Sequence, residues 1–213
     1  MSTEVKTKEK VDMDPKYIIK LTVTLFVTCV VVAALLGLVD NVTREKIAAI
    51  NWENTVNAMK AVVADPDTTT FSDPLEDIEA AAAAAAAAGG TLDSVYEVQV
   101  GGAGAGYAIK VVASGSQGNI EMMVGVDSEN VVTGVSIVDN SETAGIGSKV
   151  MENQNGVLDQ FIGKSAADGT LAVGTNVDAI TGATVSSKGV TAGVNAALAA
   201  AGAIGLERGS RIL

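Results

Sequence analysis

Hydrophobic positions follow three successive patterns along the chain. The first is an unbroken apolar run from Leu21 to Val39, which contains no charged residue. As a helix this run is roughly 28 Å long, close to the thickness of a bilayer core. We therefore predict a transmembrane helix over residues 16–39. Apolar residues then recur at helical spacing from Thr43 to Val63, which predicts that the helix continues as a stalk.

The second pattern is an alanine tract that follows the stalk. Asp65 to Thr70 is rich in turn-forming residues and predicts a loop. Ser72 or Asp73 is positioned to cap a helix, with Pro74 at its first position. The alanines from Ala80 to Ala88 have high helix propensity but little apolar surface, so we expect a surface or loosely packed helix, ended by the two glycines that follow. A low-complexity linker is the alternative.

The third pattern begins at Thr91, where apolar residues alternate with polar ones. Such alternation predicts the strands of an antiparallel sheet. The predicted strands are Ser94–Val100, Tyr107–Ala113, Ile120–Val126 and Asn130–Val138. For Gly101 to Gly106 we favour a glycine-rich hairpin over a phosphate-binding loop, because the segment lacks Gly-Lys-Ser/Thr and is followed by a strand.

A closing helix completes the predicted fold. Apolar residues at helical spacing predict this helix from Ser186 to Ala203, followed by a loose tail from Glu207 to Leu213. Between the sheet and this helix we expect a short strand at Ala172 and Val173. We also expect an apolar patch there, formed by Val157, Leu158, Phe161 and Ile162. The predicted fold class is α+β: one N-terminal transmembrane helix, then an antiparallel sheet flanked by helices.

Composition narrows the function classes. The net charge is −11, from 14 basic and 25 acidic residues, which argues against nucleic-acid binding. The chain has no histidine, which excludes histidine metal sites and catalysis through Ser-His or Cys-His pairs. The single cysteine, Cys29, lies in the apolar run. The chain therefore forms no internal disulfide and holds no iron–sulfur cluster by itself.

Basic residues predict the orientation of the membrane segment. Lysines before the apolar run are Lys6, Lys8, Lys10, Lys16 and Lys20, whereas the following residues carry fewer basic side chains. The positive-inside rule then places residues 1–15 in the cytoplasm as a tail and residues 40–213 outside it. The apolar run is longer than the core of a signal peptide and has no clear cleavage site before Asp40. We therefore favour an uncleaved, single-pass anchor in the cell (inner) membrane.

The candidate chemistry lies in the segment Asp178-Ala179-Ile180-Thr181-Gly182-Ala183-Thr184. The neighbouring residues are small, which leaves the Thr184 hydroxyl open to another enzyme. A helix beginning here would direct free N–H groups and a partial positive charge at the same place, which suits a phosphate. Residue types alone nevertheless favour a capped turn before an ordinary helix, since Ser186 and Ser187 are good caps.

The pattern Asp-x-x-Thr-Gly-Ala-Thr resembles the flavin-attachment motif of FMN-binding domains in the Rnf and Nqr respiratory complexes. In that family a flavin transferase uses FAD to join FMN, through its phosphate, to the hydroxyl of the last threonine, here Thr184. A second family signature, Glu-Thr-Pro-Gly-x-Gly, is matched by Glu142-Thr143-Ala144-Gly145-Ile146-Gly147, with Ala144 in place of proline. The resemblance covers about residues 91–200, and the N-terminal anchor fits it too. It is strongest to the G subunits of Rnf complexes, with the C subunits of Nqr complexes next.

The resemblance implies roles for the matching residues. Thr184 would carry FMN covalently, and Thr181, Gly182 and Ala183 complete its motif. Asp178 would orient the motif or be recognised by the transferase, with a turn-stabilising role as the alternative.

Further roles are implied around the flavin. Glu142 and Thr143 would lie near the flavin or its ribityl chain, although Glu142 also suits a solvated loop. Gly145 and Gly147 would allow close backbone approach or a positive φ. Ser187, with Ser186, would donate to the phosphate, and N-capping is the alternative.

The implied function is that of a non-catalytic electron carrier in an ion-translocating complex of the Rnf type, a ferredoxin:NAD oxidoreductase. Its partners would be the other membrane and soluble subunits, the flavin transferase and membrane lipid. The implied organisation is a tail (1–15), a transmembrane helix (16–39), a stalk with the alanine-rich segment (40–90) and an FMN-binding domain (91–213).

Three alternatives remain open. In the first, the chain would be a subunit like NqrC in a sodium-pumping NADH:quinone oxidoreductase. In the second, it would be a membrane-anchored binding or structural module without flavin. The third alternative is a flavin enzyme acting on a small extracellular acceptor. Covalent flavin separates the flavin carriers from the module, and co-purification with membrane partners separates a component of a complex from a free-standing enzyme.

Overall fold

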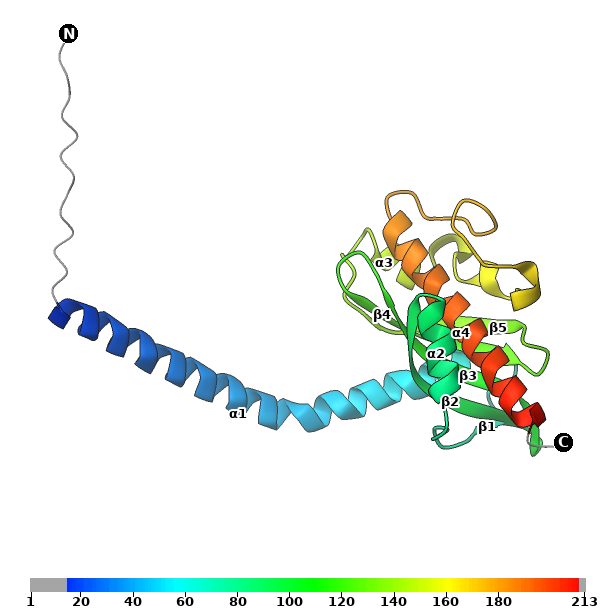
Figure 1. Ribbon diagram of the computed structural model, residues 1–213, viewed down its shortest axis with the longest axis horizontal. Coiled ribbons are helices and arrows are strands. Elements are labelled where there is room, and N and C mark those ends of the chain that lie inside the picture. Colours follow the sequence, from blue (N-terminus) through cyan, green and yellow to red (C-terminus); the bar gives the residue numbers. More distant parts are fainter. Residues whose placement is uncertain (1–14, 211–213) are drawn as a thin grey trace, which may run out of the picture. The chain divides into compact units, whose positions relative to one another are not determined.

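The computed structural model describes residues 15–210, and the side chains of residues 15–205 (Figure 1). The chain divides into two compact units, Met1–Ile50 and Asn51–Leu213. The predicted cytoplasmic tail, residues 1–15, therefore lies almost wholly outside the described residues. The second unit begins at Asn51, well before the start predicted for the FMN-binding domain, because its first residues pack on the sheet.

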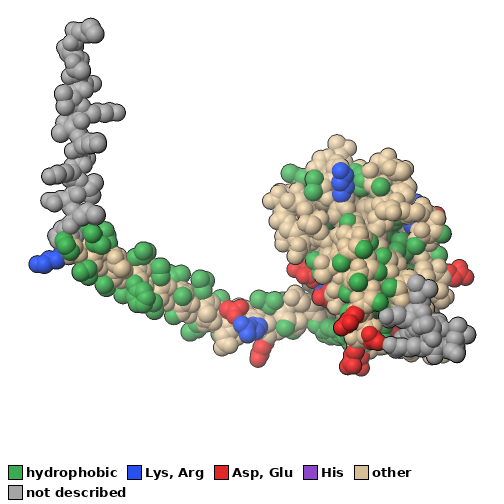
Figure 2. All heavy atoms as spheres, viewed as in Figure 1, with side chains coloured by type: hydrophobic (Ala, Val, Ile, Leu, Met, Phe, Trp, Pro, Cys, Tyr) green, Lys and Arg blue, Asp and Glu red, His purple; other side chains and the backbone are tan. Residues whose placement is uncertain are grey.

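Helix α1, Pro15–Ala61, confirms the predicted continuous helix from the apolar run into the stalk. Its N-terminal part is long and apolar enough to cross a membrane, and apolar side chains cover it (Figure 2). The hydroxyls of Thr22, Thr24 and Thr28 donate to carbonyl oxygens four residues earlier, at 2.8–2.9 Å. These three polar groups are thus satisfied inside the helix, as a surrounding without water requires.

Five antiparallel strands form one sheet in chain order. They are β1 (Thr69–Phe71), β2 (Gly90–Val100), β3 (Ala103–Ser114), β4 (Asn119–Asp127) and β5 (Val132–Asn140). The strands β2 to β5 confirm the four predicted strands, with ends that differ by a few residues. With helices on both faces, this sheet confirms the α+β class.

Two predictions for the sheet were wrong in detail. The segment predicted as a loop ends in β1, whose residues pair with Val98 to Val100 at the edge of the sheet. The predicted glycine-rich hairpin over Gly101 to Gly106 is confirmed, but its turn is only Gly101 and Gly102, because Ala103 and the glycines after it pair with the end of β2. Glycine carries no side chain, so the alternation that marks a strand is invisible in this part of the sequence.

The end of α1 covers one face of the sheet. Ala58, Met59 and Val62 are buried there against a cluster that includes Met123 of β4. Gly125 and Gly134 face each other on β4 and β5, and a Cβ on either would collide with Val62. Close approach of the helix end to the sheet therefore requires glycine at both positions.

Helices α2 (Glu79–Ala87) and α4 (Thr184–Ser210) lie together on the other face (Figure 1). The alanine tract forms the predicted helix, and Ala80, Ala83, Ala86 and Ala87 are exposed on it, but the helix also has a buried side, formed by Ala81 and Ala85. Their small side chains allow α2 to approach α4 and the sheet closely. The predicted cap was wrong: α2 starts at Glu79, whereas the Ser72 hydroxyl accepts a hydrogen bond from Glu97 N–H of β2 at 2.9 Å.

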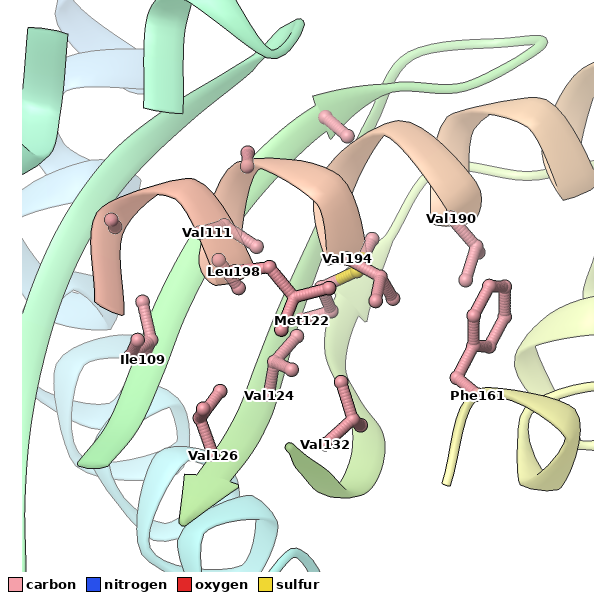
Figure 3. Packing of buried hydrophobic residues seen from close by; sticks show 14 of the residues in the cluster. Ile109, Val111, Met122, Val124, Val126, Val132, Phe161, Val190, Val194 and Leu198 are labelled. Carbon is pink, nitrogen blue, oxygen red and sulfur yellow. The ribbon is translucent and has the colours of Figure 1, made fainter. Parts of the chain in front are cut away.

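Helix α4 supplies most of the core on this face. It is longer than predicted at both ends, starting at Thr184 and continuing to Ser210 through much of the predicted loose tail; residues 211–213 lie outside the described chain. Its predicted apolar positions are buried, and Val194 and Leu198 lie over β3 and β4 (Figure 3). Because neighbouring residues of a strand point to opposite faces, Met122 belongs to this core and Met123 to the other.

Short helical turns connect β5 to α4. They are α3 (Ser148–Met151), η1 (Gln154–Gly156), η2 (Asp159–Phe161) and η3 (Ala166–Asp168). The predicted apolar patch is confirmed for Val157, Leu158 and Phe161, which are buried, but Ile162 is exposed. The predicted strand at Ala172 and Val173 was wrong, since Val173 makes only an isolated bridge to Val177.

Candidate functional site

The segment from Asp178 to Ser187 forms a tight turn that leads directly into α4. Ala183 N–H donates to the Ile180 carbonyl at 2.9 Å, and Gly182 has φ +84°. Ser187 N–H donates to the Ala183 carbonyl at 2.9 Å, so Ala183 caps the helix and Thr184 is its first residue. The chain enters α4 two residues earlier than predicted, which places Thr184 in the first turn.

The hydroxyl groups of this turn divide into two kinds. Thr184 is exposed, and its hydroxyl has no hydrogen-bond partner among the described residues. Ser187 is buried: its hydroxyl donates to the Ala183 carbonyl at 3.0 Å and accepts from Ile180 N–H at 3.3 Å. Ser187 therefore supports the turn from inside, while Thr184 is presented to the surroundings.

The first turn of α4 also leaves backbone donors unused. The N–H groups of Thr184, Val185 and Ser186 have no acceptor within the helix, because no turn precedes them. None of them has another acceptor in the described part of the chain. These N–H groups lie at the positive end of a 27-residue helix and would favour an anionic group at Thr184.

Glu142 connects three segments beneath this turn. One carboxylate oxygen accepts from Ser116 N–H at 2.6 Å and from Gln117 N–H at 3.3 Å, in the turn between β3 and β4. The other oxygen accepts from the buried Ser186 hydroxyl at 2.6 Å. Glu142 is thus a partly buried tie between the sheet and α4 rather than a solvated loop residue.

The glycines of the Glu142–Gly147 loop act in different ways. Gly145 has φ +76°, which favours glycine, and its N–H donates to the Ser148 hydroxyl at 2.9 Å. Gly147 has an ordinary helical backbone, but a Cβ there would collide with the Glu142 carboxylate and lie 2.9 Å from the Ser186 hydroxyl oxygen. The first glycine shapes the loop, and the second makes room for the Glu142–Ser186 hydrogen bond.

Two adjacent hollows flank the turn. We call the first the Thr184 hollow, of about 320 Å³. It is lined by Ser116, Gln117, Glu142, Thr143, Ile146, Gly147 and residues 182–186. The second, the Asp178 hollow, measures about 430 Å³ and is lined by Lys149, residues 154–157, Gln160 and residues 178–181.

The fold brings most of the predicted site residues together. The Thr184 hollow contains Glu142, Thr143, Gly147, Gly182, Ala183 and Thr184, and the Asp178 hollow contains Asp178 and Thr181. Gly145 and Ser187 line neither hollow. The predicted glycine-rich hairpin joins β2 and β3 at the end of β3 opposite to Ser116 and Gln117, so it is not part of this site.

The structure adds residues that the sequence motifs did not indicate. Ser116 and Gln117 bind Glu142 through backbone N–H groups, which any residue except proline supplies, so no sequence signal marks them. Gln160 binds the backbone of Asp178 from η2, eighteen residues earlier. Exposed Ile146 and Val185 add apolar surface to the rim of the Thr184 hollow.

The carboxylate of Asp178 differs from that of Glu142, which is hydrogen-bonded. Asp178 is exposed, and its carboxylate has no partner among the residues whose side chains are described.

A network of ion pairs lies away from the site, on β3, where Lys110 contacts Glu121 at 3.1 Å and Asp93 at 3.3 Å. Burial lowers the pKa of Lys110, but the hydrogen bond and charge of Glu121, together with Asp93, outweigh it and raise the pKa above 10.5.

Comparisons with known proteins identify the family of this chain. Residues 115–199 match the FMN-binding domain family. The G subunit of the Na⁺-translocating ferredoxin:NAD⁺ oxidoreductase complex of Acetobacterium woodii is 36% identical over 201 residues, 90% of this chain and 95% of that protein. The G subunit of the ion-translocating oxidoreductase complex of Methanosarcina acetivorans is 31% identical, over 87% of this chain and 95% of that protein.

A solved structure of the C subunit of Na⁺-translocating NADH-quinone reductase from Parabacteroides distasonis has a TM-score of 0.49 and 18% identity, over 74% of this chain and 93% of that chain. The two relatives, similar along nearly their whole length, decide the family. This chain belongs to the G subunits of ion-translocating oxidoreductase complexes of the Rnf type.

Proposed function

We propose that this chain is an electron-carrier subunit of an Rnf-type ion-translocating membrane complex and relays electrons through FMN bound to Thr184 by a phosphoester bond. The observation that carries the proposal is the exposed Thr184 hydroxyl in the first turn of α4, which has no hydrogen-bond partner in the described part of the chain. The match of residues 115–199 to FMN-binding domains and the names of the two relatives support it.

The residues at the turn suit the phosphate of FMN. The Thr184 hydroxyl supplies the attachment oxygen, and the free N–H groups of the first turn supply donors and a partial positive charge. Ser187 and Gly182 hold the turn, and Glu142 holds α4 to the sheet through Ser186. Bound flavin would exchange one or two electrons, while the protein determines its position and electrostatic surroundings.

In the proposed attachment, a flavin transferase transfers FMN from FAD to Thr184. Thr184 Oγ1 forms a bond to the phosphorus of the FMN half, and the pyrophosphate bond of FAD breaks. AMP leaves with the bridging oxygen, and the hydroxyl proton is released. The chain gains the mass of FMN less one water. Exposed Asp178, six residues earlier in the motif, is the group that we assign to recognition by the transferase.

The proposal includes a membrane topology. The apolar part of α1 would be a single-pass anchor with its N-terminus in the cytoplasm and the flavin domain outside, according to the lysine distribution. A covalent bond would then prevent loss of a cofactor that the cell could not replace there. A reporter fused after Leu213 should be active outside the cytoplasm, and activity only in the cytoplasm would refute this orientation.

The deciding experiment is the intact mass of the denatured full-length chain after co-expression with a flavin transferase. We expect a gain of FMN less one water for the wild type and none for Thr184→Ala. Thr175→Ala is the matched control, because Thr175 is also exposed but lies outside both hollows, and it should gain the full mass. No gain by the wild type would favour a membrane-anchored module without flavin.

A second experiment tests the assembly. The tagged, flavin-loaded chain should co-purify with integral membrane partners from its native membranes. Recovery of the loaded chain alone, with reductase activity on a small acceptor, would instead favour a free-standing flavin enzyme.

A further inference from the structure

Gln160 joins η2 to the attachment motif through three hydrogen bonds. Its Oε1 accepts from Asp178 N–H at 2.7 Å, and its Nε2 donates to the Asp178 carbonyl at 3.0 Å. Nε2 also donates to the Val157 carbonyl at 2.7 Å. Both backbone groups of Asp178 are therefore bound by one side-chain amide, as a neighbouring strand would bind them.

Only a neutral amide of this length fits these partners. The oxygen faces one N–H donor and the nitrogen faces two carbonyl oxygens, so the reversed amide would face like groups on every side. A carboxylate would set a negative oxygen against two carbonyl groups. Asparagine is one methylene shorter and would not reach Asp178 from the same backbone position.

The backbone that carries Gln160 is itself fixed. Val157, Leu158 and Phe161 around it are buried, and the Phe161 ring lies beside Val190 of α4 (Figure 3). Leu158 N–H donates to the Asn153 side chain at 2.7 Å. Because this segment packs against α4, the hydrogen bonds of Gln160 hold Asp178 in a fixed position relative to α4.

We propose that Gln160 is a positioning residue for flavin attachment, which holds the segment from Asp178 to Thr181 in the conformation at which Thr184 is modified. The inference rests on the function proposed above. The segment is bound at two points, at Asp178 by Gln160 and at Ile180 by Ser187. The Asp178 carboxylate and Thr181, next to these ties, stay exposed, so a transferase meets them in one fixed arrangement with Thr184.

The chain contains a matched control for the same kind of bond. Asn195 of α4 accepts from Leu171 N–H at 3.0 Å and donates to the Leu171 carbonyl at 2.8 Å. Like Gln160, Asn195 has a partly buried side-chain amide that binds both backbone groups of one residue between β5 and α4. It lies outside both hollows. Loss of this bridge weakens the fold but leaves the Asp178 tie in place.

The test compares initial rates of FMN attachment for the full-length chain in detergent, with FAD in excess and limiting flavin transferase. The rates are measured well below the unfolding temperature of every variant. We expect Gln160→Ala to attach FMN about tenfold more slowly or worse, and Asn195→Ala to attach it at nearly the wild-type rate, although both lower the unfolding temperature. Equal rates for Gln160→Ala and wild type, or equal slowing in both variants, would overturn the proposal.

Gln160→Glu gives a second readout if the alanine variant does not fold. Protonation of the introduced carboxyl restores one donor toward the carbonyl groups, so its rate relative to wild type should rise as the pH falls. A ratio that does not depend on pH would contradict the positioning role. If the wild type gains no flavin at all, the proposed function itself is refuted. If the wild type gains flavin and Gln160→Ala gains it equally fast, only the Gln160 proposal fails.

Discussion

The loops Glu142–Gly147 and Asp178–Thr184 meet at the start of α4, yet their polar groups are used in opposite ways. In the first loop the Glu142 carboxylate binds two backbone N–H groups and the Ser186 hydroxyl. In the second, the Asp178 carboxylate and the Thr184 hydroxyl have no partners in the described part of the chain, while the backbone is bound by Gln160 and Ser187. The first loop stabilises the site, and the second presents chemical groups to another molecule.

This difference separates stability from modification. A polar group that is already satisfied contributes to the fold, and its removal leaves buried partners without hydrogen bonds. An exposed, unpartnered group contributes little to folding, so its substitution changes only what binds or reacts there. The two loops should therefore respond differently to substitutions of similar size.

The largest expected effect is on attachment at Thr184. Thr184→Val keeps the shape of the side chain but removes the hydroxyl, so covalent flavin should fall to zero while the free energy of unfolding changes by less than about 0.5 kcal/mol. Thr184→Ser is the control that keeps the hydroxyl and should still gain FMN. Mass spectrometry and chemical denaturation of the same samples measure both quantities. Flavin on the valine variant would show that another residue carries it.

The next effect is on stability, at Glu142. Glu142→Ala leaves two backbone N–H groups and a buried hydroxyl without their acceptor, and should cost about 2–4 kcal/mol in the free energy of unfolding. Glu142→Gln keeps an acceptor for the N–H groups and a partner for Ser186, and should cost about 1 kcal/mol. Urea denaturation of both variants measures the difference. Equal, small losses would mean that the first loop is not the structural tie that we describe.

A smaller effect is expected at Asp178. Because its carboxylate has no partner among the described side chains, Asp178→Asn should change the free energy of unfolding by less than about 0.5 kcal/mol. The initial rate of FMN attachment should fall about tenfold if the transferase recognises the charge, as a charge-assisted contact would imply. Asp67→Asn, at another exposed aspartate before β1, is the matched control and should attach FMN normally. A normal rate for Asp178→Asn would show that the transferase does not recognise this charge.

The smallest effect is a pH dependence away from both loops. Because the pKa of Lys110 is raised above 10.5 in the folded chain, its ion pairs contribute fully below that pH, and the contribution is lost as the pH rises through the higher folded value. The stability of the wild type should therefore fall faster than that of Lys110→Met above about pH 10.5. Urea titrations on both sides of that pH measure this difference. Parallel curves would refute the contribution of Lys110, and Lys110→Met should not alter attachment at neutral pH.

Prediction from the sequence succeeded where the signal is local. The apolar run of α1 is recognised from its length and composition alone. The alternation in β2 to β5 and the spacing of Val190, Val194 and Leu198 each reflect one element burying one face. It failed where burial depends on a distant partner. A run of alanines does not show which side of α2 is buried, because α4 and the sheet decide that Ala81 and Ala85 are covered. The glycines at the start of β3 give no alternation to read.

The sequence by itself determined the membrane-length helix, the α+β class and the two short signatures, because each depends on residues close together in the chain. Only the tertiary structure decided that the turn after β3, Glu142 and Ser186 meet in one hydrogen-bonded group, and that Gln160 binds Asp178. Those contacts join segments far apart in sequence, and their geometry follows from strand register and from the close packing of α4 on the sheet. The same packing buries Ser187 and leaves Thr184 exposed, a distinction that two neighbouring hydroxyl residues cannot reveal in the sequence.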